Sequence, residues 1–140
     1  MAYLPVELAR LAPDADTAPF WEACRRRELV LQRCVACGRF QHPPLAGCRE
    51  CGGTRLEWAR VGGRGTVFSY TIAHHPFLPA LQEHVPYNVV VVELDDAAGV
   101  RLVSNLVDTP PGEIRVGMRV ELVWEEVGAE VVLPRFRRAR

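Results

Sequence analysis

The sequence contains no lysine, because all 17 basic residues of this 140-residue chain are arginines. No residue can therefore form a lysine Schiff base or act as the lysine of a phosphate-binding P-loop. Long apolar runs are also lacking, and none approaches the roughly 18 residues that cross a membrane. The first residues, MAYLPVELARLAPDAD, have no basic segment followed by an apolar core, as a signal peptide would. We therefore expect a cytoplasmic protein with no membrane segment.

Net charge is absent as well, since 17 acidic side chains balance the 17 arginines. The balance changes along the chain: residues 1–60 hold nine arginines against seven acids, 61–134 hold four against ten, and 135–140 hold four against none. The acidic middle block is a poor electrostatic match to a phosphate backbone, which argues against a nucleic-acid partner. The basic C-terminal tail is expected either to dock on an acidic protein surface or to be unstructured.

The N-terminal part, residues 1–27, is predicted to be a loosely ordered lead-in followed by a short helix from about residue 18 to 27. Thr17 is suited to cap this helix, and Pro19 is tolerated in its first turn. Phe20 and Trp21 give the helix a partly apolar face. Such an aromatic pair packs inside the chain or anchors a partner protein.

Most of the remaining segments read as β-strands, and Gly62, Gly63 and Gly65 mark the expected boundary between two modules. After this boundary, five short strands with glycine turns predict an OB-type barrel over residues 62–140. The first of them should place Phe68, Tyr70 and Ile72 together on its core face. The expected strands are 28–33, 55–61, 66–72, 89–94, 100–106, 118–126 and 131–136.

Four of the five cysteines form two Cys-x-x-Cys-Gly units, Cys34 with Cys37 and Cys48 with Cys51. Four thiolates close a tetrahedral shell around Zn²⁺, and the glycine after each pair supplies the positive φ that the turn needs. The spacing therefore predicts a structural zinc site within a ribbon module at residues 28–61. Iron in a rubredoxin-like site uses the same ligands and stays open as an alternative. Cys24, outside the motif, is expected in the core.

The string ELVLQRCVACGRFQHPPLAGCRECGG, followed by LEWARVGGRGTVFSYTIAHHP, resembles the family that joins a zinc ribbon to an OB fold, long called domain of unknown function thirty-five. The resemblance continues through Pro86-Tyr87, VVVVEL, VGMRVEL and LPRFRR, and covers about residues 17–137. It implies a mostly β fold with an N-terminal helix, a rubredoxin-like zinc ribbon and a five-stranded OB barrel. It also implies a small accessory subunit of thiolase-like or aldolase enzymes that act on acyl-CoA, including those that shorten steroid side chains.

No serine or cysteine nucleophile stands in a recognisable motif, so we predict no catalytic residue in this chain. We expect it to bind a thiolase-like or aldolase subunit in a hetero-oligomer, with acyl-CoA as a further candidate ligand. Two alternatives stay open, namely a single-stranded nucleic-acid binder and a stand-alone acyl-CoA-binding protein or hydrolase that uses the histidines. The candidate partner or acyl-CoA surface consists of Phe20, Trp21, Arg60, Arg64, His74, His75 and Tyr87.

Overall fold

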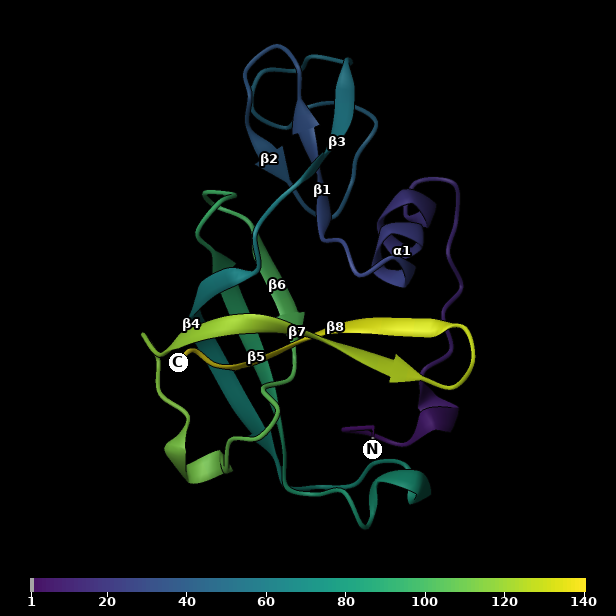
Figure 1. Cartoon of the computed structure of the whole chain (residues 1–140), viewed down its shortest axis with the longest axis vertical. Helices are drawn as coiled ribbons and strands as arrows, with labels where there is room; N and C mark the ends of the chain where they lie inside the picture. Colours follow the sequence, from purple (N-terminus) through teal and green to yellow (C-terminus); the bar gives the residue numbers. More distant parts are fainter. Residues whose placement is uncertain (1) are drawn as a thin grey trace.

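The computed structural model describes residues 2–140 and arranges the strands in two sheets (Figure 1). The smaller sheet has the order β2-β1-β3 and the larger has the order β6-β5-β4-β7-β8. Helix α1 contacts both sheets, through β1 and β8. The elements are α1 (Ala18–Arg25), β1 (Val30–Cys34), β2 (Phe40–Gln41), β3 (Leu56–Arg60), β4 (Arg64–Ala73), β5 (Tyr87–Leu94), β6 (Arg101–Ser104), β7 (Arg119–Val127) and β8 (Val131–Arg138), with 3-10 turns η1 (Val6–Leu8), η2 (Pro79–Leu81) and η3 (Pro111–Glu113).

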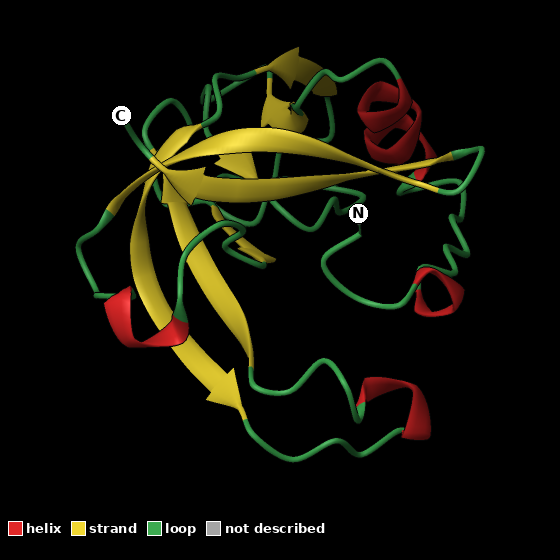
Figure 2. Ribbon diagram, turned by 60° about the horizontal axis from the view of Figure 1, so that its bottom comes forward, coloured by secondary structure: helices red, strands yellow, loops and turns green. Residues whose placement is uncertain are grey.

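The larger sheet curls into a nearly closed barrel, and its two edges come together just beyond β6 (Figure 2). Its last strand meets the chain just after β6, where Phe136 donates its N–H to the Asn105 carbonyl at 3.1 Å and accepts from the Val107 N–H at 2.7 Å. The Phe136 side chain is fully buried, together with Leu106 and Ile114. The predicted architecture of helix, zinc ribbon and nearly closed five-stranded barrel is confirmed. Within the described residues, no helix has the length and apolar character to cross a membrane.

Helix α1 begins where the sequence predicts, but it is not capped as expected. Thr17 occupies the N-cap position and makes no side-chain cap hydrogen bond. Its hydroxyl and its N–H both donate instead to Asp14, at 3.1 and 2.9 Å. Both bonds lower the pKa of the Asp14 carboxyl, and the bond from the Thr17 backbone N–H has the larger effect. A turn ahead of the helix therefore sets its start.

The expected loose lead-in is attached to the barrel through Tyr3. The Tyr3 hydroxyl accepts hydrogen bonds from the backbone and side-chain N–H groups of Asn88, at 3.0 and 2.7 Å. The Tyr3 N–H donates to the Glu125 carboxylate at 2.9 Å. The N-terminal segment therefore bridges β5 and β7, and the prediction of a loosely ordered segment was wrong at this point.

The prediction for the first barrel strand was wrong at Phe68, because β4 contains a β-bulge. The register with β5 shifts between Val67 and Ser69, so the period-two pattern breaks there. Val67 is fully buried, while Phe68 is 45% exposed on the outer surface. Tyr70 and Ile72 lie against the core as expected.

The segment expected to be a basic tail is the last paired strand of the barrel. β8 pairs with β7 as far as Arg138, which lies opposite Val120. Arg137 donates to the Glu121 carboxylate at 2.9 Å, and Arg135 lies 3.4 Å from Glu125. Arg135 and Arg137 are therefore paired within the chain, and the alternative of an unstructured terminus was wrong for residues 135–138.

Candidate metal centre

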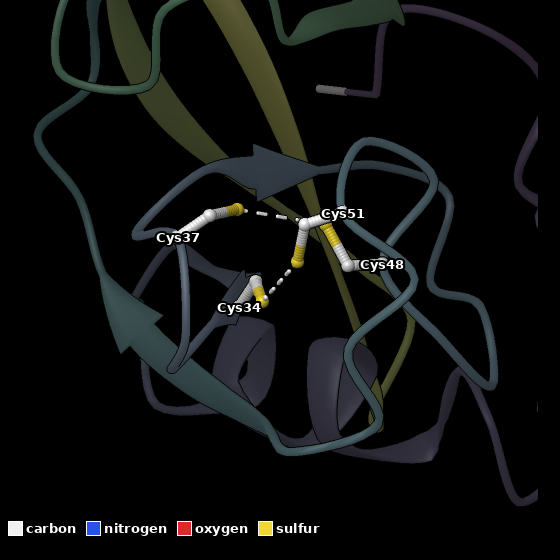
Figure 3. Close-up of side chains that lie close together, drawn as sticks. All are labelled: Cys34, Cys37, Cys48 and Cys51. Carbon is white, nitrogen blue, oxygen red and sulfur yellow. Dashed lines mark hydrogen bonds between the residues drawn. The ribbon is translucent and has the colours of Figure 1, made fainter.

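The four cysteines of the two Cys-x-x-Cys units lie at one end of the smaller sheet, with their sulfur atoms facing one another (Figure 3). The four Sγ atoms all lie within 4.8 Å of one another. Cys34 and Cys51 are 3.6 Å apart, and Cys37 and Cys48 are 3.7 Å apart. In a tetrahedral zinc site with Zn–S bonds of about 2.3 Å, neighbouring sulfurs lie about 3.8 Å apart. The geometry therefore fits Zn²⁺.

Each cysteine pair is presented by a tight turn whose glycine adopts the predicted conformation. Gly38 has φ +77° and Gly52 has φ +76°, in the left-handed region that glycine enters at no steric cost. Backbone N–H groups in the second turn point at the sulfurs. Glu50 donates to Cys48 Sγ and Gly53 donates to Cys51 Sγ, both at 3.4 Å. The turn thus supplies positive dipoles to the metal ligands.

The crowding of the sulfurs favours a bound cation. Hydrogen bonds from the backbone of Cys51 and Glu50 lower the pKa of Cys48 to about 7. At Cys51 the hydrogen bond from the Gly53 N–H also lowers the pKa. Its effect is outweighed by the neighbouring sulfurs, of which Cys34 contributes most, and by burial, so the pKa of Cys51 is raised to about 11. Four thiolates cannot share this space unless a metal ion balances their charge.

Two glutamines that the sequence analysis did not single out hold the loop between the cysteine pairs. Gln32 on β1 and Gln41 on β2 face each other in register, and both are buried. Gln32 accepts from the Leu45 N–H at 2.9 Å and donates to the Leu45 carbonyl at 3.0 Å. Gln41 accepts from the Arg49 N–H at 3.1 Å. The two side-chain amides thus fix this loop by hydrogen bonds to its backbone.

Cys24 is separate from the metal centre and lies fully buried within α1. Burial raises the pKa of its thiol to about 12, so only about one thiol in 10⁴ is ionised at pH 8. We expect iodoacetamide to modify the zinc-loaded protein slowly, to reach four cysteines after chelation, and to reach Cys24 only after denaturant is added. Peptide mass spectrometry at each stage checks this order. Rapid alkylation of Cys24 in the folded protein would contradict it.

The candidate residues on α1 lie beside a cleft of about 460 Å³ between the ribbon and the barrel. Phe20 is 6% exposed and packs edge-on against Trp21, with ring centroids 5.0 Å apart. The His42 ring, from the loop after β2, lies 5.2 Å from the Phe20 ring, and burial lowers the pKa of this histidine. Phe20 is thus a link between ribbon and helix, and only Trp21 of the expected aromatic pair is partly exposed.

The other candidate residues lie at the two ends of β4 and do not form one site. Arg60 and Arg64 are exposed near its start, and Arg64 lies 3.9 Å from the Glu121 carboxylate. His74 and His75 follow its last residue and are exposed, while Tyr87 is buried opposite that end. Ten residues of strand separate the two groups, which is about 30 Å.

Two family models match the chain in sequence. The model described as "ChsH2, rubredoxin-like zinc ribbon domain" matches residues 21–57, and "ChsH2, C-terminal OB-fold domain" matches residues 58–125. Together with the four convergent thiols, the ribbon match confirms the predicted structural zinc site. The chain therefore belongs to the zinc-ribbon and OB-fold family of ChsH2 and the DUF35 proteins.

Particular members of this family resemble the chain over most of its length. It is 45% identical to the "Probable enoyl-CoA hydratase alpha subunit" of Thermomonospora curvata and 32% identical to the "3-oxo-4,17-pregnadiene-20-carboxyl-CoA hydratase alpha subunit" of Mycobacterium tuberculosis. These matches take in 93% and 86% of this chain, but the chain spans only 40% and 37% of the length of those two relatives. A "DUF35 domain-containing scaffold protein" of Methanothermobacter thermautotrophicus is 33% identical over 82% of this chain and 86% of its own length.

A solved structure titled "Ltp2-ChsH2(DUF35) aldolase" contains a chain with the same fold. The TM-score is 0.84 at 44% sequence identity, over 94% of the present chain and 100% of the matched one. The similarity thus extends over the whole of a chain from that aldolase structure.

Proposed function

We propose that this chain is a non-catalytic accessory subunit that binds and stabilises a thiolase-like or aldolase subunit acting on acyl-CoA. The observation that carries the proposal is the match to every part of the ChsH2(DUF35) chain in the aldolase structure. The scaffold protein of similar length, which matches over 86% of its own sequence, supports it. On this view the partner supplies the reacting groups.

The chemistry of the metal centre supports a structural role. Four protein thiolates fill a zinc shell and leave no open position at which a substrate or a water molecule could be activated. His74 and His75 are exposed at the end of β4, and neither makes a hydrogen bond or ion pair among the described residues. A general base is normally oriented by a neighbouring group, and the described residues of this chain supply none to these histidines.

A steroid-derived acyl-CoA is the substrate class that we propose for the complex. The support is the pregnadiene carboxyl-CoA named for the Mycobacterium tuberculosis relative, whose matched region is this fold. The complex would work in the cytoplasm, where reducing conditions keep the four cysteines available for zinc.

Co-expression with a candidate thiolase-like or aldolase subunit, to be sought among the neighbouring genes, tests the proposal. We expect one gel-filtration peak containing both chains, and retro-aldol cleavage of an acyl-CoA substrate only when both are present. The variants His74→Ala and His75→Ala should keep that activity, because the reacting groups lie in the partner. Two separate peaks, or a partner that is equally active and equally stable alone, would contradict the proposal.

A further inference from the structure

β6 is an edge strand, and one row of its backbone groups has no partner within residues 2–140. The Leu94 N–H donates to the Val100 carbonyl at 3.2 Å, which fixes the hydrogen-bonding phase of the β5–β6 pair. Leu102 and Ser104 therefore bond to β5, while the N–H and C=O groups of Arg101 and Val103 point away from it. β6 has no strand on that side, since it ends the sheet order.

The opposite wall of this opening cannot satisfy those groups. β8 faces β6 there with Pro134, which has no N–H to offer. The Pro134 carbonyl is already taken, because the Ser104 hydroxyl donates to it at 2.7 Å. The two strands come together only further along, at the bridge between Leu106 and Phe136. The barrel is therefore open along β6.

The cleft of about 460 Å³ between the ribbon and the barrel lies in this opening. All four residues of β6 line it, and apolar groups of α1, β8 and the loop after β2 form its other sides, among them Trp21, Pro44 and Leu133. Its volume falls in the range of about 300–1,000 Å³ that binding pockets occupy. Free strand-edge groups thus border an apolar cavity.

The outer side of the same edge is apolar as well and carries one cation. Val103 is 72% exposed, and the Arg101 guanidinium lies 3.6 Å from the centre of the exposed Phe68 ring and 3.4 Å from the Glu93 carboxylate, with which it forms an ion pair. A strand added to β6 would direct alternate side chains into the cleft and onto this outer surface. Those two surfaces suit apolar residues, because the charge of Arg101 is already balanced by Glu93.

We propose that an extended segment of the partner subunit adds to β6 as a sixth strand, with backbone hydrogen bonds to Arg101 and Val103 and an apolar side chain in the cleft. This proposal rests on the proposed function and specifies where that complex forms. Strand addition of this kind draws affinity from main-chain bonds and specificity from side-chain pockets. The cleft and the edge supply both.

The variant Val103→Pro tests the backbone contact. Proline removes an N–H that is unused in the isolated chain and is tolerated on an outward-facing strand edge, so the fold should persist. We expect the Kd of the complex to rise about tenfold or more, because the variant loses one backbone hydrogen bond and fits the added strand less well. Val103→Thr keeps the N–H and is the matched control, which should bind within about threefold of the parent.

Hydrogen exchange of the Arg101 and Val103 amides gives a readout that does not depend on the proline variant. Both amides should exchange at least about tenfold more slowly in the complex than in the free chain. A complex that leaves both amides unprotected would overturn the strand addition and leave the proposed function intact. Failure to form any complex would overturn both. If the chain dimerises alone and protects both amides, the edge belongs to a second copy, which also overturns the partner strand.

Discussion

Serine in place of Cys48 is expected to abolish zinc binding and unfold the smaller sheet. The variant loses a ligand from a closed four-thiolate shell, and the three remaining cysteines cannot complete the tetrahedral site. Structural zinc contributes about 10–16 kcal/mol of apparent binding free energy in zinc-finger peptides, and binding is coupled to folding. This exceeds what a small module can recover by other means.

Metal analysis and amide exchange measure the result. Zinc should fall from about one to under about 0.1 per chain, and the β1 amides should lose their protection. Cys24→Ala is the matched control, because it removes a buried thiol outside the shell and should keep the zinc. Full zinc occupancy in Cys48→Ser would contradict the assignment, and a coloured parent protein loaded with iron would replace zinc by the alternative metal.

Leucine in place of Asn88 is expected to lower the free energy of unfolding by about 3–5 kcal/mol, because two buried backbone groups lose their partners. Asn88 is 1% exposed and accepts from the Leu106 N–H at 2.6 Å while donating to the Leu106 carbonyl at 2.8 Å. Leucine has similar volume and can do neither. The substitution would remove the side chain that holds the backbone of Leu106, which forms the bridge to Phe136 between the two edges of the barrel. A urea titration followed by far-ultraviolet circular dichroism measures it.

Tyr3→Phe is the matched control for this network. It removes the hydroxyl that accepts from Asn88 and leaves the inner pair with Leu106 intact, so about 0.5–1.5 kcal/mol should be lost. Equal losses in Tyr3→Phe and Asn88→Leu would contradict the larger contribution expected of the bonds to Leu106. Such a result would mean that the hydrogen bonds between Tyr3 and Asn88 account for most of the contribution of Asn88 to the free energy of unfolding.

The metal ligands could be predicted from the sequence because ligand spacing is local. Cys34 to Cys51 lie within one short segment, and the required turns appear as Cys-x-x-Cys-Gly. Strand positions followed from period-two alternation wherever the ladder is regular. The pattern failed at Phe68, since a bulge depends on the partner strand and leaves no mark in the residues themselves.

The cleft could not be predicted, for a different physical reason. Its walls come from α1, the loop at His42, β6 and β8, which are separated by tens of residues. Only the closing of the barrel brings these segments together. The alternative of an unstructured terminus was wrong for the same reason, since Glu121 and Glu125 on β7 pair with its arginines only once β8 is paired.

The place of β8 in the chain has a consequence for how the protein is made. The ribosome adds about 5–20 residues per second, so the segment with Cys34 and Cys51 emerges several seconds before Phe136. Zinc can be captured during that interval, because its four ligands and the strands that present them all lie before residue 61. The barrel must wait for β8, whose pairing with Asn105 and Val107 comes last. Until then the unclosed strands are the stretch that most needs chaperone protection.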